Sequence, residues 1–192
     1  MNQGSPEWIV ARVGKVTASR IADVMAKVKN GEAASRATYR AELVAERLTG
    51  RPAGSDFTNA AMRWGTEAEP MARAAYEAEC GVLVRQCGLI DHSTVPMSGA
   101  SPDGLVGADG LVEIKCPDTK AHIETLLDDR APAKYLPQMQ WQMACTDRDW
   151  CDFVSFDPTH AGRSATVRGA REPRPRSHRR DGVGSDGVPG RG

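Results

Sequence analysis

The sequence predicts a domain of the α/β (α+β) class, with a central mixed sheet flanked by helices. Two observations predict it. Residues 19–79 carry apolar residues mainly at helical spacing, whereas residues 81–115 contain short apolar runs bounded by Gly, Pro and Asp. A further helical stretch and an alternating run follow at 134–143 and 150–157. Helices on either side of a block of strands are typical of a layered sheet domain. With 192 residues and 40% apolar content, the chain is long enough for one hydrophobic core.

The helical part divides into three segments. Ser19 is expected to cap a helix that runs to about Lys27, and Thr38–Leu48 is expected to form a helix that ends at Gly50. The segment 59–79 is expected to break at Gly65, where Thr66 caps a second helix. The expected buried stripe of that second helix is Met71, Ala74, Ala75 and Ala78.

The charge balance and apolar content of the chain change after Pro158. Net charge is zero overall, but residues 159–192 contain eight Arg against three acids and almost no apolar residues. Such a segment cannot bury enough apolar surface to fold, so residues 1–158 are expected to form the domain and 159–192 a disordered tail. The chain has no 18-residue apolar run and no signal-peptide start, and its five cysteines are an odd number. We therefore expect no membrane segment, and reduced thiols in the cytosol.

The cysteines leave two interpretations open. Four of them could form a metal or iron–sulfur site, in which Cys145 and Cys151 join Cys80 and Cys87. None has the CxxC spacing, however, and small buried hydrophobic residues are the simpler interpretation.

The stretch Ser101–Pro117, SPDGLVGADGLVEIKCP, organises the rest of the chain. An Asp-Gly pair lies between two apolar runs, which is a strong hairpin signal. Side chains alternate along a strand, so Glu113 and Lys115 share one face and Ile114 points to the other. Folding the hairpin brings Asp103 towards Glu113. The predicted result is a pocket with two carboxylates and one ammonium group.

That combination suits a Mg²⁺-dependent phosphodiesterase. Mg²⁺ takes oxygen ligands and keeps several waters, so one or two carboxylates hold it. A neighbouring lysine can position the attacking water and stabilise developing negative charge. The alternative is that an acid-x-lysine pair on a strand is simply a solvated face.

Five motifs, in order, resemble the phage lambda exonuclease (YqaJ-like viral recombinase) family of the PD-(D/E)xK nuclease superfamily. They cover about Trp8–Pro158 and are listed here in chain order: Trp8 with RVGKVTAS, Trp64-Gly65 with Glu69, SPDGL followed by EIKCP, Tyr135 with Gln138 and Gln140, and Phe156-Asp157-Pro158. The resemblance implies a restriction-endonuclease-like core. It also implies a DNA exonuclease that degrades linear double-stranded DNA from its 5′ ends to leave 3′ overhangs for phage-type recombination.

The resemblance further implies roles for single residues. Asp103, Glu113 and Lys115 would be catalytic, and Asp103 and Glu113 would bind Mg²⁺, or Mn²⁺ in its place, as two ions with help from Glu69 and the Ile114 carbonyl. Lys115 would orient the attacking water. The implied DNA-binding residues are Arg12, Thr17 and Ser19 at the 5′ end and Tyr135, Gln138 and Gln140 around the active site. On spacing alone, Tyr135, Gln138 and Gln142 share one helical face.

The implied partners are double-stranded DNA ends, a single-strand annealing protein and two further copies of the chain in a toroidal trimer. Two rival functions remain open: an endonuclease with the same core, and an inactive prophage remnant that only binds DNA. The family pattern stops at Pro158, which suggests a shifted reading frame or a degraded gene copy. The basic tail could instead bind DNA phosphates without sequence preference.

Overall fold

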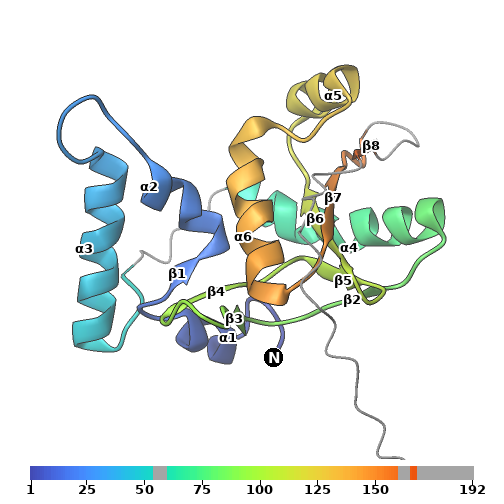
Figure 1. Cartoon of the computed structure of the whole chain (residues 1–192). Coiled ribbons are helices and arrows are strands. Elements are labelled where there is room, and N and C mark those ends of the chain that lie inside the picture. The colour runs from blue at the N-terminus through green and yellow to red at the C-terminus, as the bar shows by residue number, and fades with distance from the viewer. Residues whose placement is uncertain (54–59, 160–164, 168–192) are drawn as a thin grey trace, which may run out of the picture.

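The computed structural model describes residues 1–53, 60–159 and 165–167, and contains two sheets with helices packed around them (Figure 1). The strands are β1 (Val16–Thr17), β2 (Val84–Arg85), β3 (Ile90–Asp91), β4 (Ser98–Ala100), β5 (Gly104–Val106), β6 (Gly110–Lys115), β7 (Trp150–Ser155) and β8 (Ala165–Val167). The α-helices are α1 (Pro6–Arg12), α2 (Ile21–Met25), α3 (Ala34–Thr49), α4 (Ala60–Cys80), α5 (Thr119–Asp128) and α6 (Leu136–Thr146). Two short 3₁₀ turns, Ala18–Arg20 and Ala133–Tyr135, precede α2 and α6.

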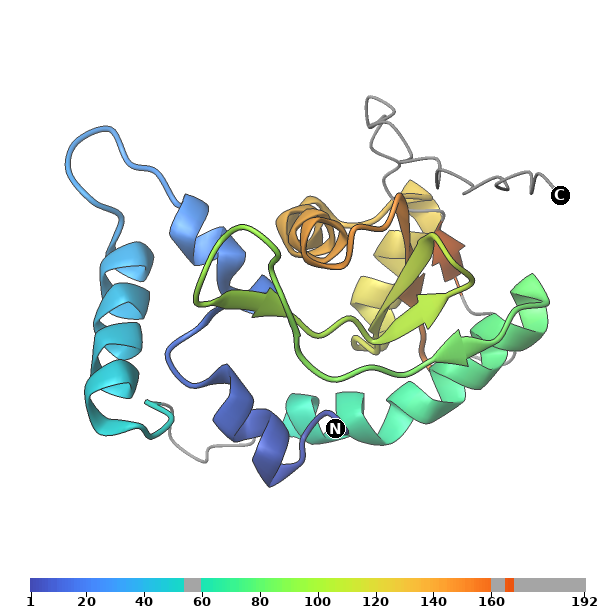
Figure 2. The ribbon, with the colours of Figure 1, turned by 60° about the horizontal axis from the view of Figure 1, so that its bottom comes forward.

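The larger sheet has the strand order β2-β5-β6-β7-β8, and the smaller has the order β1-β4-β3. Strands β6 and β7 are parallel, as are β1 and β4, and the remaining neighbours are antiparallel. The predicted class, an α+β domain with a mixed sheet, is therefore confirmed. Helix α4 covers one face of the larger sheet, and α6 covers the other (Figures 1 and 2).

The two larger apolar clusters of the described core lie one on each face of the larger sheet, and a third, smaller cluster contains Ala18, Ala100 and Cys145. Leu111 of β6 packs with α6, while its neighbours Val112 and Ile114 pack with Ala72 and Tyr76 of α4. This alternation confirms that Ile114 points away from the face of Glu113 and Lys115. The face of β6 that carries Glu113 and Lys115 is thus the face that α6 covers.

The predicted hairpin is formed by β5 and β6, and two glycines allow it to pack closely. A Cβ atom on Gly104 would lie 2.0 Å from Val84 Cγ1, and one on Gly110 would lie 2.0 Å from the Trp150 ring. Since no side chain tolerates such approaches, glycine is required where β5 meets β2 and where β6 meets β7. These close contacts fix the loop that carries Asp103.

Helix α4 differs from the prediction for residues 59–79. Gly65 and Pro70 both lie inside one continuous helix, so Thr66 is not a cap; the predicted start at Asn59 lies outside the described residues. The expected stripe is also wrong, because Met71 is half exposed and the buried side chains are Ala68, Ala72 and Tyr76. The prediction assumed a helix break at Gly65 that the packing of α4 does not allow, and it therefore assigned the wrong residues to the buried face.

Helix ends were predicted with mixed success. Gly50 ends α3 in the left-handed conformation, as expected. Asp118 caps α5 by accepting from Ala121 N at 2.8 Å. Ser19, however, does not cap α2: it lies within the 3₁₀ turn, and Arg20 occupies the position before α2 without a side-chain cap. The Ser19 hydroxyl is therefore available to other partners.

The segment beyond Pro158 is described only at Thr159 and at β8. Strand β8 pairs antiparallel with β7, an element that the composition did not predict. The disorder expected for the rest of the tail falls on residues 160–164 and 168–192, which lie outside the described residues. No helix of the described ranges is long and apolar enough to cross a membrane.

All five cysteines are free thiols. Cys145 and Cys151 are buried in apolar clusters, whereas Cys80 is exposed. Among the described residues no group of His, Cys, Asp and Glu converges as a metal cage would, so the structure does not form the alternative metal or iron–sulfur site at the cysteines.

Candidate active site

The β5–β6 hairpin brings Asp103, Glu113 and Lys115 together, as the sequence predicted. Gly104 pairs with Val112, and extending this register places Asp103 opposite Glu113. Asp103 Oδ2 accepts a hydrogen bond from Ile114 N at 2.7 Å, and Lys115 Nζ lies 2.5 Å from Glu113 Oε1. The three charged groups are therefore held by two adjacent strand ends.

Glu113 is completely buried, and α6 supplies its hydrogen-bond donors. Gln138 Nε2 donates to Oε1 at 2.5 Å, and Gln142 Nε2 donates to Oε2 at 2.6 Å. Together with Lys115, three donors meet one carboxylate, which explains how a buried negative charge is tolerated here. Helical spacing placed Gln142 on the same face as Gln138, but no role was predicted for it; the spacing was the available signal.

A cavity of about 420 Å³ opens beside these groups. Its lining comes from α4, the hairpin with the two residues after it, and the 3₁₀ turn before α6: Gly65, Thr66, Glu69, Asp103, Ile114, Lys115, Cys116, Pro117 and Tyr135. Glu113 lies behind this wall, sealed by its donors. Asp103 and Lys115 are thus the predicted catalytic groups that the cavity reaches directly.

Burial and neighbouring charge reinforce each other in shifting the pKa of Asp103, whereas they oppose each other for Lys115. Burial raises the pKa of Asp103 well above its ordinary value, and the negative charge of Glu113 adds to this rise. For Lys115, burial alone would lower the pKa, but the charges of Glu113 and Asp103 outweigh it and the pKa is raised. Lys115 therefore stays an ammonium group, while Asp103 carries excess negative potential that a bound cation would offset.

The oxygen donors fit a divalent cation, with unequal capacity. A carboxylate offers about four acceptor positions. Asp103 uses one of them on Ile114 N, whereas Glu113 uses three, on Lys115, Gln138 and Gln142. Asp103 is therefore the open ligand, and Glu113 has room for one bond at most.

Glu69, the third predicted metal ligand, lines the cavity from α4. Its Oε1 accepts from Arg73 Nη2 at 2.5 Å within the same helix. In the described part of the chain it does not join Asp103 and Glu113 in a three-carboxylate cluster. Glu69 is placed at the site, but it is held by Arg73.

The predicted residues of α6 and the turn before it divide into two groups. Tyr135 lines the cavity and stacks on Phe153 with ring centroids 5.3 Å apart. The centre of its ring lies 5.4 Å from Lys115 Nζ. Gln138 contacts Glu113. Gln140 is partly buried, and within the described ranges its side chain makes no hydrogen bond, so the structure does not bring it to the carboxylates.

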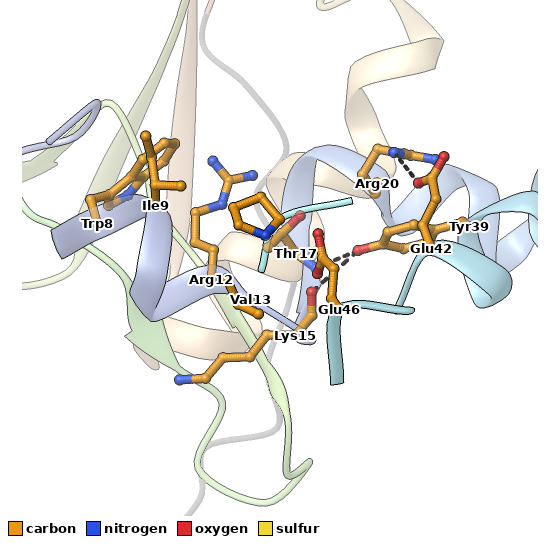
Figure 3. A pocket seen from close by; sticks show the side chains of 11 residues that line it. Trp8, Ile9, Arg12, Val13, Lys15, Thr17, Arg20, Tyr39, Glu42 and Glu46 are labelled. Carbon is orange, nitrogen blue, oxygen red and sulfur yellow. Dashed lines mark hydrogen bonds and ion pairs between the residues drawn. The ribbon is translucent and has the colours of Figure 1, made fainter. Parts of the chain in front are cut away.

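A second cavity, of about 300 Å³, contains Arg12 and Thr17 (Figure 3). Thr17 Oγ1 lies 3.3 Å from Ser19 Oγ, and Arg12 Nη2 lies 3.5 Å from the same oxygen. The three residues predicted to bind a 5′ end therefore converge. In Figure 3 the Arg12 guanidinium lies between Trp8 and Thr17.

Arg12 is the available cation of this cavity. Lys15 is paired with Asp91 and Arg20 with Asp23 and Glu42, whereas no carboxylate of the described residues pairs with Arg12. Its guanidinium instead lies 4.0 Å from the centre of the Trp8 ring. Burial lowers the pKa of Arg12, but an arginine stays protonated at any physiological pH. A planar cation beside two hydroxyls is suited to a phosphate group.

One hydrogen bond links the two cavities. Trp8 Nε1 donates to Ser101 Oγ at 2.9 Å, and Ser101 lies two residues before Asp103. The helix that carries Arg12 is thereby attached to the loop that carries Asp103. Neither this bond nor a role for the Ser101 hydroxyl was predicted, because nothing in the sequence indicates that α1 reaches this loop.

The chain is similar to known exonucleases over most of its length. The chain is similar to LHK-Exo, an alkaline exonuclease from Laribacter hongkongensis, with 52% identity over 86% of this chain and 83% of that one and a TM-score of 0.77. The structure of LHK-Exo in complex with dAMP gives 57% identity over 81% and 75%, with a TM-score of 0.74. A phage-related exonuclease from Haemophilus somnus 129PT shares the fold, at 18% identity over 74% and 68% and a TM-score of 0.61. No curated protein matches. The sequence profile of the YqaJ-like viral recombinase domain matches residues 7–149, and the chain belongs to this family.

Proposed function

We propose that this chain is a Mg²⁺-dependent exonuclease that degrades linear double-stranded DNA from its 5′ ends and leaves 3′ single-stranded overhangs for phage-type recombination. The observation that carries the proposal is the hairpin that holds Asp103, Glu113 and Lys115 at one cavity. Its similarity to alkaline exonucleases at more than 50% identity supports the reaction class.

Asp103 would hold Mg²⁺, or Mn²⁺, with Glu113, the Ile114 carbonyl and Glu69 as further donors. When bound, such a cation supplies Lewis-acid stabilisation of the phosphate and a water of lowered pKa; two ions would share these tasks. Lys115 projects an ammonium group at the cavity, where it orients the attacking water and neutralises charge that develops on the phosphate. Gln138 holds Glu113, and Tyr135 forms the wall against which the DNA strand lies. Gln140 would reach the DNA backbone from α6.

Arg12, Thr17 and Ser19 would bind the 5′ phosphate in the second cavity. The Trp8–Ser101 bond ties that cavity to the Asp103 loop, so binding of a strand end would set the position of the scissile linkage. This coupling supports an enzyme that starts at an end. It gives no comparable support to an endonuclease, which must bind DNA without an end.

The proposed setting is the cytosol of a bacterial host, with duplex DNA ends as substrate and a single-strand annealing protein as partner. A toroidal trimer around the DNA is proposed from the family alone. Where residues 159–192 bind DNA, they would do so through arginine contacts with phosphates.

The test compares three substrates with the purified full chain. We expect Mg²⁺-dependent release of mononucleotides from 5′-phosphorylated linear duplex, slower release from duplex with 5′ hydroxyl ends, and no cleavage of closed circular DNA. Lys115→Ala should abolish release while the protein stays folded. Cleavage of intact circles would instead establish the endonuclease, and DNA binding without hydrolysis would establish the inactive remnant.

A further inference from the structure

We propose that Gln142 is a positioning residue that fixes the Glu113 carboxylate for metal binding, and this inference rests on the proposed function. Gln142 is fully buried on α6, and its Nε2 lies 2.6 Å from Glu113 Oε2. Gln138, one turn earlier, donates to the other oxygen. The two glutamines hold the carboxylate from both sides.

The surroundings of Gln142 are those of a core position. The other buried residues of α6 are Met139, Met143 and Cys145, none of which carries an amide. Burying an amide costs free energy unless it is hydrogen-bonded, so an apolar side chain would suit packing alone. The use of the amide here is its bond to Glu113.

The far side of the amide faces the Cys151 thiol of β7. Cys151 Sγ lies 4.0 Å from Gln142 Oε1 and 3.7 Å from Asp152 O, so its single S–H is shared between two acceptors. The amide nitrogen faces the carboxylate, and a flipped amide would turn its oxygen towards Glu113 and lose the bond at 2.6 Å. The orientation of the amide is therefore set mainly by Glu113.

The consequence for the site follows from counting acceptor positions. Lys115 and Gln138 share Oε1, and Gln142 takes one position of Oε2, which leaves about one of four positions for a cation. Without Gln142, Glu113 could rotate about its last side-chain bond and Oε2 would lack a fixed direction. Loss of such a supporting hydrogen bond typically lowers metal affinity or activity about 10- to 100-fold.

The experiment compares Gln142→Met, which keeps the side-chain volume and removes the donor, with Met143→Ala, which damages the same helix core without touching Glu113. Calorimetry with Mn²⁺ alone measures metal affinity, and nuclease assays separate kcat from KM. For Gln142→Met we expect Mn²⁺ affinity and kcat to fall about 10- to 100-fold with KM for duplex DNA unchanged. Met143→Ala should lower Tm while Mn²⁺ affinity stays unchanged. A Gln142→Met variant that loses only Tm would overturn the proposal.

If the wild-type chain binds Mn²⁺ but does not degrade DNA, the proposed function fails, and the calorimetric results still decide the role of Gln142.

Discussion

Asp103 and Glu113 face each other across one hairpin, yet neutralising them is expected to change stability in opposite directions. Asp103→Asn removes a buried charge whose pKa is raised by burial and by Glu113, while the amide oxygen can still accept from Ile114 N. Glu113→Gln places an amide where three donors converge. Asp103→Asn is therefore expected to raise the free energy of unfolding, and Glu113→Gln to lower it.

The magnitude for Glu113→Gln follows from its partners. The new NH₂ group must face at least one of Gln138, Gln142 and Lys115, which leaves a buried donor unsatisfied at a cost of about 1–3 kcal/mol. Lys115 also loses a charge-assisted bond worth about 1.5–3 kcal/mol. Even about 3 kcal/mol in total would lower Tm by roughly 6–12 °C in a chain of this length.

The sign for Asp103 depends on pH. Its folded-state pKa lies above the unfolded value, so its destabilising effect is absent below the unfolded pKa and grows as pH rises towards the folded one. In metal-free buffer at neutral pH, Asp103→Asn should therefore raise Tm by about 2–4 °C for each kcal/mol relieved, and the gain should vanish in acid. Mg²⁺ at ten times its Kd should stabilise the wild type by about 1.4 kcal/mol and leave the variant unchanged.

Thermal denaturation in EDTA and in Mg²⁺, over a range of pH, measures all of these effects. Both variants should lose nuclease activity, so activity alone cannot separate them. If Asp103→Asn is less stable than wild type in EDTA at neutral pH, Asp103 acts as a structural acceptor and the electrostatic reasoning is refuted. An unchanged Tm for Glu113→Gln would refute the three-donor arrangement.

Three further predictions concern the scaffold and the second cavity. Gly104→Ala should destabilise the domain by about 1–3 kcal/mol, because its Cβ would lie 2.0 Å from Val84 Cγ1, and Val84→Ala should restore much of the loss in thermal denaturation. Arg12→Gln should raise KM about 10-fold or more on 5′-phosphorylated ends and far less on 5′ hydroxyl ends, as steady-state assays would show. Hydrogen bonds from Thr119 and Thr159 lower the pKa of Asp157 to about 2. Asp157→Asn should therefore be less stable than wild type above about pH 4, and the difference should disappear as pH falls towards 2. Acid denaturation of both proteins measures this difference.

The hairpin that brings Asp103 and Glu113 together was predictable because its signals are local. The Asp-Gly turn sets the strand pairing, and alternation along β6 then determines which side chains share a face. Gly50 was identified for the same reason, since the end of a helix depends on neighbouring residues. A turn or a helix end can be predicted from the sequence when the residues that determine it are neighbours in the chain.

What could not be predicted depends on packing between distant segments. Gly65 and Pro70 remain inside α4 because the helix lies against the sheet, where Ala72 and Tyr76 are buried. Likewise Ser19 bonds towards Thr17 rather than capping α2, because the short strand β1 pairs with β4 and extends the backbone before it. Contacts such as Trp8–Ser101 have no local signature at all.

The sheet itself explains why two neighbouring carboxylates have such different surroundings. Glu113 points to the face covered by α6, whose glutamines saturate it, whereas Asp103 opens to the cavity that α4 borders through Glu69. One acid is thereby held rigid, and the other keeps free oxygen positions together with an unfavourable charge. In the proposed mechanism, a cation that enters the cavity would offset the charge of Asp103 and would be oriented by Glu113. The same division makes Asp103 the expected site of the trade-off between stability and activity.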